Sequence, residues 1–455
     1  MKKLASILKN KEIMNRILFT VLILFIFRIG AQITVPGVTI EGGQLEEYLN
    51  SGNALSLMNL LGGGTLQTFS IFALGVSPYI TAQIIVQLLA TDVLPALTEL
   101  KRQGQYGRKK MELATRYLTL LLGAVQAYGI IQTMKTSDLI TFNAGTYEWL
   151  TYIYIVIIML AGSMLVMWLG DQISVKGIGN GISMIIFAGI VSSLPTQVSG
   201  AFQKWVIAGT ATGVDVNAIT GVFKFILYIV SFLLIIAFVT FIELSQRKIP
   251  IQHSGKGGGQ TQSMARASFL PIKINSAGVI PVIFASSIMM APSVIAAFIG
   301  DGSAANGAWT NIFNASKMTD MGGGVQFPWG IIIYIVLTIA FTFFYSNIQI
   351  APDQMAENFQ KNGSYIPGIR PGIETERYIR KVLNRVTVIG ALALAFIAAL
   401  PSALTLSGVF GNDSSLALGG TGLIIVVGVC LELNNQIDGL LAGKSFDEVV
   451  ASGGR

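Results

Sequence analysis

The chain has 455 residues, of which 52% are hydrophobic and only 12% are charged. Soluble globular chains carry about 25% charged residues, so this composition excludes an ordinary soluble protein and indicates a polytopic membrane protein. The formal net charge of +7 is not a sign of nucleic-acid binding, because in a membrane protein the placement of positive charge matters more than its sum. With a single cysteine, Cys430, the chain cannot form a disulfide framework of its own.

The N-terminal segment, residues 1–16, is basic and carries apolar residues at helical spacing. This pattern is typical of a short amphipathic helix lying on an anionic lipid surface. The apolar run 17–35 follows, and it is long enough to cross a bilayer. Because it lacks a clear small-residue cleavage site, we expect it to be a retained first span.

Residues 55–89 are apolar but are interrupted twice, by three glycines at 62–64 and by Gly75 with Pro78. A helix needs about 20 continuous apolar residues to cross a bilayer. Lipid cannot satisfy free backbone groups, so a broken segment at membrane depth must face protein or water. We therefore predict a half-helix over 65–74, a turn at Gly75 and a second helix beyond it, all beside a path through the membrane.

Eight further apolar runs follow this broken second span. Most of the 30 Lys and Arg residues fall in segments that are cytoplasmic if the N-terminus is cytoplasmic. The positive-inside rule therefore predicts an all-α membrane protein with ten transmembrane helices and both termini in the cytoplasm. The eight runs are 114–134, 150–169, 181–198, 219–242, 276–299, 329–348, 386–402 and 420–438.

The second and seventh spans are irregular, and they hold matching places in two sets of five. The second is broken at Gly75 and Pro78, and the seventh carries Gly278, Pro281 and Pro292. Matched interruptions predict two inverted-repeat halves, residues 1–200 and 201–455, with the path at their interface. Ordinary helix kinks would give the same pattern without a repeat.

The predicted path is lined by branched aliphatic residues. Val76 and Ile80 are four residues apart, as are Ile182 and Ile186, so each pair shares one helix face. A ring of such side chains can seal a pore by excluding water. Plain helix packing would give the same spacing.

The sequence holds no set of residues typical of an enzyme or a metal site. The only histidine, His253, lies in a glycine-rich loop, so we predict no catalytic residues, no metal and no cofactor. Ionisable residues inside spans are functional candidates by default, and here they are Arg28, for which we favour structural pairing, and Glu432. Glu432 lies near the predicted cytoplasmic end of the last span, and the predicted path holds no acid, which disfavours ion coupling.

Two predicted cytoplasmic loops, 243–274 and 349–385, are long and basic. The positive-inside rule explains some of this charge, but it does not explain loops of this length with ordered turn signals. We expect these loops to be docking surfaces for an anionic partner.

Sequence motifs that follow one another in order along nearly the whole chain identify a family. They are FRIG (27–30), VPG (35–37), SIFALGVSPYITAQIIVQLL (70–89), GRKK (107–110), TRY (115–117), MWLGDQI (167–173), GIGNGISMIIFAGIV (177–191), INSAGVIPVIFASSI (274–288), PGIRPG (367–372) and GGTGLIIVVG (419–428). With these strings the chain resembles the SecY family, the central channel subunits of the bacterial Sec protein translocase.

The resemblance implies three sets of site residues. The first is a plug in the second span, at about 57–72, with Leu60, Leu61, Gly62, Gly63, Gly64, Thr65, Leu66, Phe69 and Phe72. The second is a pore ring of Val76, Ile80, Ile182, Ile186, Ile283 and Ile425. The third is a set of polar residues in a lateral gate, Thr81, Gln126 and Asn275.

The resemblance also implies an activity and its partners. The family conducts unfolded secretory chains across the bacterial plasma membrane and releases apolar segments sideways into it, once a signal peptide has opened the gate. Arg247, Lys248 and Arg370 match the loops that bind the ribosome or the SecA ATPase, and the small subunits SecE and SecG complete the complex. Two other interpretations remain open at this stage: an ion-coupled secondary transporter of small solutes that uses Glu432, and a scaffold that conducts nothing.

Overall fold

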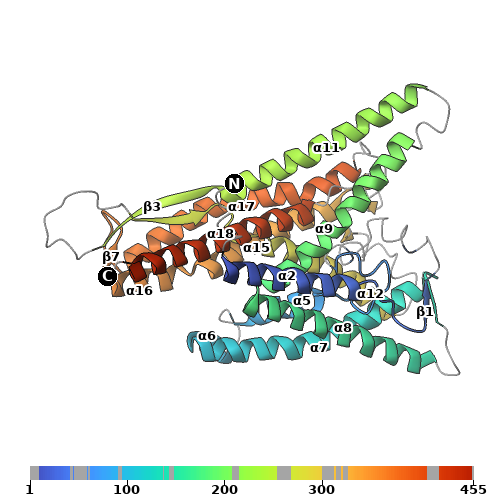
Figure 1. Ribbon diagram of the computed structural model, residues 1–455, viewed down its shortest axis with the longest axis horizontal. Coiled ribbons are helices and arrows are strands. Elements are labelled where there is room, and N and C mark those ends of the chain that lie inside the picture. Colours follow the sequence, from blue (N-terminus) through green and yellow to red (C-terminus); the bar gives the residue numbers. More distant parts are fainter. Residues whose placement is uncertain are drawn as a thin grey trace.

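The computed structural model describes residues 10–40, 45, 59, 62–90, 95–136, 138–142, 148–207, 215–253, 268–299, 312–313, 319–320, 326–406 and 420–452. Helices dominate it and pack side by side, and α9 and α11 rise away from the others (Figure 1). The helices are α2 (Lys11–Gly30), α5 (Ser77–Leu89), α6 (Pro95–Arg102), α7 (Gln105–Thr136), α8 (Glu148–Lys176), α9 (Gly181–Phe202), η1 (Gln203–Ile207), α11 (Asp215–Leu244), α12 (Ile280–Ile299), α15 (Trp329–Ile350), α16 (Pro352–Lys361), α17 (Ile373–Leu406) and α18 (Gly420–Ser452).

Each of the ten predicted spans coincides with one of these helices. Within the described residues, eight helices are long and apolar enough to cross a membrane. The remaining two are α5, an apolar helix of only 13 residues, and α12, which has 20 residues and is apolar over Ile280–Met289; they correspond to the second and seventh spans, which the sequence marks as irregular. The two halves of the chain meet where α12 packs against α5 and α7, and where α18 packs against α9.

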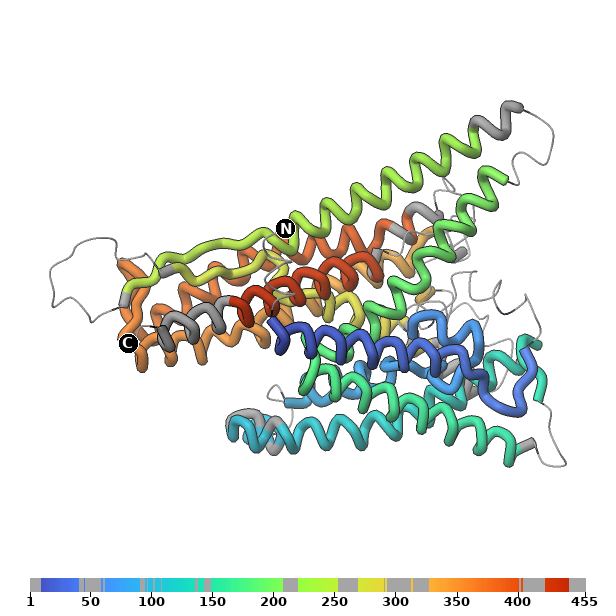
Figure 2. Tube along the Cα trace, in the orientation of Figure 1, coloured from blue at the N-terminus to red at the C-terminus, as the bar shows by residue number. Residues whose placement is uncertain are grey.

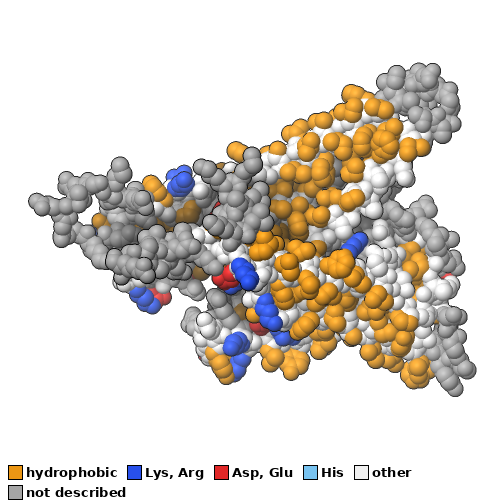
Figure 3. Space-filling view, in the orientation of Figure 1, with side chains coloured by type: hydrophobic (Ala, Val, Ile, Leu, Met, Phe, Trp, Pro, Cys, Tyr) orange, Lys and Arg blue, Asp and Glu red, His pale blue; other side chains and the backbone are white. Residues whose placement is uncertain are grey.

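Large apolar side chains cover much of the outer surface of the helices (Figure 3). Phe25 of α2 and Phe223 of α11, for example, are each 66% exposed. Such a surface is typical of contact with lipid or with a partner rather than with water. The charged side chains visible in Figure 3 gather mostly toward the end of the molecule that carries β3, α6 and α16.

The first helix begins and ends earlier than the sequence predicts. Asn10 caps α2 by accepting a hydrogen bond from the backbone N–H of Glu12, so residues 11–16 form the first turns of this helix instead of a separate surface helix. Residues 1–9 lie outside the described part. The helix ends at Gly30, not at residue 35, because residues 31–35 leave it to pair with a later segment. The Ile71 N–H donates to the Ile33 carbonyl at 2.9 Å, and the Val35 N–H donates to the Phe69 carbonyl at 3.0 Å.

The segment that precedes α5 is not the half-helix that we predicted over 65–74. Its described residues from 63 to 76 form successive turns, because its amide groups bond to residues 31–35 and to one another. The predicted turn at Gly75 is present, with a φ of 54°, and α5 begins two residues later. Figure 2 shows the chain folding back beside the end of α2. We call residues 62–76 the re-entrant segment.

The two basic segments that we predicted as loops contain regular secondary structure. Strands β3 (Gln246–His253) and β4 (Ser268–Lys273) form an antiparallel hairpin, and the short strand β7 (Ser364–Tyr365) pairs with the far end of β3. Ile249 and Ile272 of the hairpin are buried against Ile366, Ile379 and Leu383. This small apolar core joins both loops into one body, which we call the hairpin body (246–253, 268–273 and 350–383).

The remaining strands are short antiparallel pairs. β1 (Val38–Ile40) pairs with β2 (Ile140–Phe142), and β5 (Thr319–Asp320) pairs with β6 (Gln326–Phe327). The first of these pairs ties the chain after α2 to the end of α7.

Candidate functional site

The residues predicted to form a pore ring come together in one buried cluster of mostly aliphatic side chains, which we call the aliphatic cluster. They reach it from both halves of the chain, on α5, α9, α12 and α18, although they are far apart in sequence. The six ring side chains are all aliphatic, so they offer no polar group that would keep water in place. Five of the residues are buried members, and Ile182 packs against them: Val76, Ile80, Ile186, Ile283 and Ile425.

The re-entrant segment packs against this cluster. Phe72 is one of its members, and its ring stacks on that of Phe27 of α2, with centroids 5.8 Å apart and planes 7° from parallel. Leu66 and Phe69 are fully buried in a second apolar cluster, with residues of α7 and α8. The segment therefore lies wedged between α2, the aliphatic cluster and α7–α8. Of the predicted plug residues, Leu60 and Leu61 lie outside the described part.

Hydrogen bonds from three other elements hold the re-entrant segment. Besides its pairing with residues 33–35, the Thr68 hydroxyl donates to the Ala31 carbonyl at 3.0 Å. The Ser163 hydroxyl of α8 donates to the Gly75 carbonyl at 3.0 Å. The Arg28 guanidinium donates from Nη1 to the Gly63 carbonyl at 2.9 Å. Arg28 thus has a partner within the bundle, and that partner is a backbone carbonyl.

The three predicted gate residues do not form one network. The Thr81 hydroxyl bonds to the Ser77 carbonyl of its own helix. The Nδ2 of Asn275 donates to Oε1 of Glu243 at the end of α11, at 2.5 Å. Within the described part of the chain, Gln126 Oε1 and Asn275 Oδ1 are buried without a hydrogen-bond partner. Thr81 and Gln126 lie on α5 and α7, which pack against α12, and Asn275 lies in the turn that precedes α12.

Comparison with known proteins decides the family. The family model described as SecY matches residues 70–434. The "Protein translocase subunit SecY" of Mycoplasma capricolum subsp. capricolum is 42% identical over 98% of this chain and 91% of its own length. The protein of the same name from Streptococcus gordonii is 41% identical over 98% of this chain and 97% of its own length. The chain belongs to the SecY family.

Solved structures show the same fold at low sequence identity. "The structure of a protein conducting channel" matches with a TM-score of 0.66 and 19% identity, over 94% of this chain and 92% of that one. A structure reported as "The plug domain of the SecY protein stablizes the closed state of the translocation channel and maintains a membrane seal" gives a TM-score of 0.65 at 19% identity and the same coverage. "Sec61 in the Canine ribosome-channel complex from the endoplasmic reticulum" gives 0.64 at 18% identity, over 94% and 92%. This chain therefore has the helical SecY/Sec61 channel fold.

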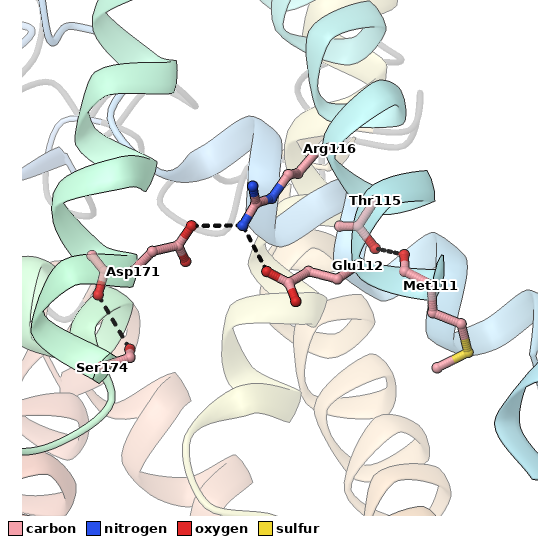
Figure 4. A network of polar contacts seen from close by, with 7 residues as sticks. Met111, Glu112, Thr115, Arg116, Asp171 and Ser174 are labelled. Atoms are coloured by element: carbon pink, nitrogen blue, oxygen red, sulfur yellow. Dashed lines mark hydrogen bonds and ion pairs between the residues drawn. The ribbon is translucent and has the colours of Figure 1, made fainter. Parts of the chain in front are cut away.

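An ion pair that the sequence analysis missed joins two helices of this SecY-family chain. Arg116 reaches from α7 to Asp171 of α8, with 2.8 Å between Nη2 and Oδ2, and it also contacts Glu112 at 2.7 Å (Figure 4). The three side chains are 30–49% exposed. The sequence did hold a signal for this pair. Two of the motifs shared with the SecY family, TRY and MWLGDQI, carry opposite charges. In the predicted topology, both motifs lie at the cytoplasmic ends of neighbouring spans.

The predicted partner-binding residues lie on the surface of the hairpin body. Arg247 and Lys248 are exposed on β3, and Arg370 is exposed in the turn before α17. The Arg370 carbonyl accepts a hydrogen bond from the Thr375 hydroxyl at 2.8 Å, which fixes the backbone of this turn. The three basic side chains are thus presented by an ordered support.

Glu432 does not have the surroundings of an ion-coupling residue. It is exposed on α18, where Gln436 of the next turn contacts it at 3.5 Å. Gln436 in turn accepts a hydrogen bond from the Gly179 N–H in the α8–α9 turn. Among the described residues, no group of three His, Cys, Asp or Glu side chains could hold a metal ion.

Proposed function

We propose that this chain is the protein-conducting channel subunit of a bacterial Sec translocase. It moves unfolded secretory chains across the plasma membrane and releases apolar segments sideways into the lipid. The observation that carries this proposal is the aliphatic cluster, in which ring residues from α5, α9, α12 and α18 of both halves meet, among them Ile80, Ile186 and Ile283. A seal made of apolar packing has no fixed polar geometry to break, so it can widen around many different chains and close again afterwards.

In this proposal the six predicted ring residues within the cluster form the pore ring, and residues 62–72 of the re-entrant segment belong to the plug. Phe72 packs on the ring, and the segment fills the space between α2 and α7–α8. Helices α5 and α7 face α12 and α15 across the lateral gate. Polar residues inside this boundary set the free energy of opening the gate. The buried amide oxygens of Gln126 and Asn275 lack hydrogen-bond partners within the described part of the chain, so they favour any state that brings them water or a donor.

The topology belongs to the same proposal. All ten helices span the membrane, in two inverted-repeat halves, 1–200 and 201–455, and both termini face the cytoplasm. The irregular second and seventh spans, α5 and α12, lie together where the halves meet, as an inverted repeat with a central path requires.

The hairpin body is the proposed docking site for the ribosome and the SecA ATPase. A related channel fold is known in a ribosome-channel complex, and the exposed Arg247, Lys248 and Arg370 supply the positive charge that an anionic partner needs. SecE and SecG would cover part of the exposed apolar helix surface, and Lys11 and Arg16 at the start of α2 would contact anionic lipid.

The transporter interpretation is not supported. The relatives named above are translocase subunits, and the best candidate for ion coupling, Glu432, is exposed. Coupled transport would place a carboxylate near the bilayer midplane at the substrate site.

A crosslink tests conduction. Cys430 is exposed and is replaced by Ser; Ile186 is replaced by Cys, and a secretory chain with one cysteine in its mature part is stalled during translocation. A disulfide between the two places a polypeptide within the ring. The matched control is Val191→Cys on the same helix, which is 38% exposed and does not belong to the aliphatic cluster, so it should not react. If the stalled chain crosslinks to neither position at any length, while the hairpin body still crosslinks to it, the channel proposal is wrong.

A further inference from the structure

Arg28 lies near the end of α2, after a stretch of that helix (17–27) that holds no charged residue. It is half-buried in α2, and its Nη1 donates to the Gly63 carbonyl at 2.9 Å. In the described part of the chain, no carboxylate pairs with it. A guanidinium at membrane depth is costly unless it is paired, so such residues generally have a role. Here the partner is the backbone of the re-entrant segment, not another helix.

Gly63 is held from its other side by α9. Its φ is +76°, and a Cβ built on it would overlap the backbone of Gly189. A Cβ on Gly189 would in turn overlap the backbone of Gly63. The two backbones are therefore in direct contact, and only glycine at both positions allows this approach. Residue 63 thus sits between a charged donor on α2 and a glycine on α9.

The two ends of the re-entrant segment are attached differently. Residues 68–71 bond to residues 31–35 through main-chain and hydroxyl groups, and the carbonyl of Gly75 is bound by Ser163. The other end, at Gly63, is held by Arg28 and Gly189. The attachment of residues 68–71 consists of main-chain and hydroxyl bonds to the residues that directly follow α2. The attachment at Gly63 can be released without breaking any of those bonds.

We infer that Arg28 and Gly189 form a latch on Gly63 that sets how readily the re-entrant segment leaves the aliphatic cluster, and hence how strong a signal sequence must be to open the channel. This inference rests on the proposed function. When the segment moves, the Gly63 carbonyl loses its charged donor and its glycine contact. A weakened latch therefore destabilises the closed state while leaving the ring, the gate helices and the hairpin body unchanged.

The test uses the full chain, assembled with its small subunits, and two substitutions that weaken the latch in different ways. Arg28→Gln removes the charge-assisted hydrogen bond, and Arg28→Lys retains a positive donor. Gly189→Ala adds a methyl group that displaces Gly63, while alanine suits the helix better than glycine does. Gly200→Ala on the same helix is the matched control, because a Cβ there would meet nothing within 4 Å.

Two measurements are made on each variant: the resting ion conductance in planar bilayers, and the export of one reporter with a full signal sequence and one whose signal has a shortened apolar core. We expect Arg28→Gln and Gly189→Ala to raise the resting open probability about tenfold, which corresponds to about 1.4 kcal/mol. Both should increase export of the weak-signal reporter and leave the full-signal reporter unchanged. Arg28→Lys should lie between Arg28→Gln and the parent chain, and Gly200→Ala should match the parent.

The outcomes separate the latch from the proposed function. If the parent chain exports the full-signal reporter but Arg28→Gln and Gly189→Ala match it in both measurements, the latch is wrong and the channel function stands. If both variants lose full-signal export without gaining weak-signal export, the contacts serve only assembly, and the latch is again wrong. Should Arg28→Gln fail to assemble, Gly189→Ala decides alone. A parent chain that exports neither reporter overturns the proposed function itself.

Discussion

The aliphatic cluster makes a quantitative prediction about leakage at rest. Ile186 is 3% exposed in the aliphatic cluster, where ring residues from α5, α9, α12 and α18 meet. Shortening a buried isoleucine to alanine costs about 2–5 kcal/mol, because apolar contacts are lost and a cavity remains. If the closed state loses only the lower value of about 2 kcal/mol relative to an open state in which these side chains have separated, the open fraction rises about thirtyfold.

The assay is the resting conductance of the assembled complex in planar bilayers, with Ile186→Ala, Ile80→Ala and the double variant. Each single variant should conduct ions at rest well above the parent chain. Because Ile80 and Ile186 belong to one cluster, the double variant should leak more than either single variant but less than additive free energies require.

The control is a residue with the same chemistry in another cluster. Ile397 of α17 is 2% exposed in an apolar cluster with α11 and α18, so Ile397→Ala should lower the thermal stability of the complex without raising its conductance. The reasoning is refuted if Ile186→Ala conducts no more than the parent, or if Ile397→Ala leaks equally, since leakage would then follow general destabilisation and not loss of the seal.

Three further substitutions test the surrounding structure. Asp171→Asn removes the ion pair with Arg116; because the pair is partly exposed, it should cost no more than about 1 kcal/mol, and a double-mutant cycle of thermal unfolding with Arg116→Gln measures the coupling. Arg370→Glu should slow SecA-driven export at limiting SecA without changing the amount of assembled complex, and normal rates there would contradict docking at this turn. Ile379→Ala, at a fully buried position of the hairpin body, should cost about 2–5 kcal/mol locally and make the hairpin body sensitive to protease while the membrane helices stay resistant.

Hydropathy predicted the helices well because lipid imposes a simple constraint on length and composition. All ten apolar runs correspond to helices; of the two irregular runs, the second span corresponds to the short α5 and the seventh span to the 20-residue α12. The ends of elements were harder to predict. The run 17–35 is largely apolar, yet the helix stops at Gly30 because Ile33 and Val35 bond to Ile71 and Phe69 much later in the chain. Such a long-range pairing leaves no trace in local composition.

The hairpin body was missed for a different reason. Its strand β3 alternates Ile249 and Ile251 with other residues, which is the pattern of a half-buried strand. The sequence analysis considered only the basic residues of this segment, and it attributed them to membrane topology and to partner docking. The partner-binding residues were therefore predicted on loops, whereas they lie on an ordered support.

The predicted ring residues come together in space, and the predicted gate residues do not. The ring depends only on apolar side chains that reach a common core, which helix spacing and the resemblance to the SecY family both indicated. Asn275, by contrast, bonds to Glu243 on α11, and Arg28 bonds to a backbone carbonyl. Neither partner follows from sequence, because polar pairing depends on the final positions of helices that are far apart in the chain.

The three consecutive glycines before α5 have a physical explanation in these contacts. Hydropathy treats residues 62–64 only as an interruption. In the structure Gly63 and Gly64 have φ values of +76° and +82°, which other residues adopt at a cost, and Gly63 touches the backbone of Gly189. A segment that must fill a channel at rest and still leave it benefits from close backbone contact at Gly63, because such contact excludes water without interlocking side chains that would resist release. In the proposed mechanism, the glycines thus allow a tight seal that opens without unfolding α5.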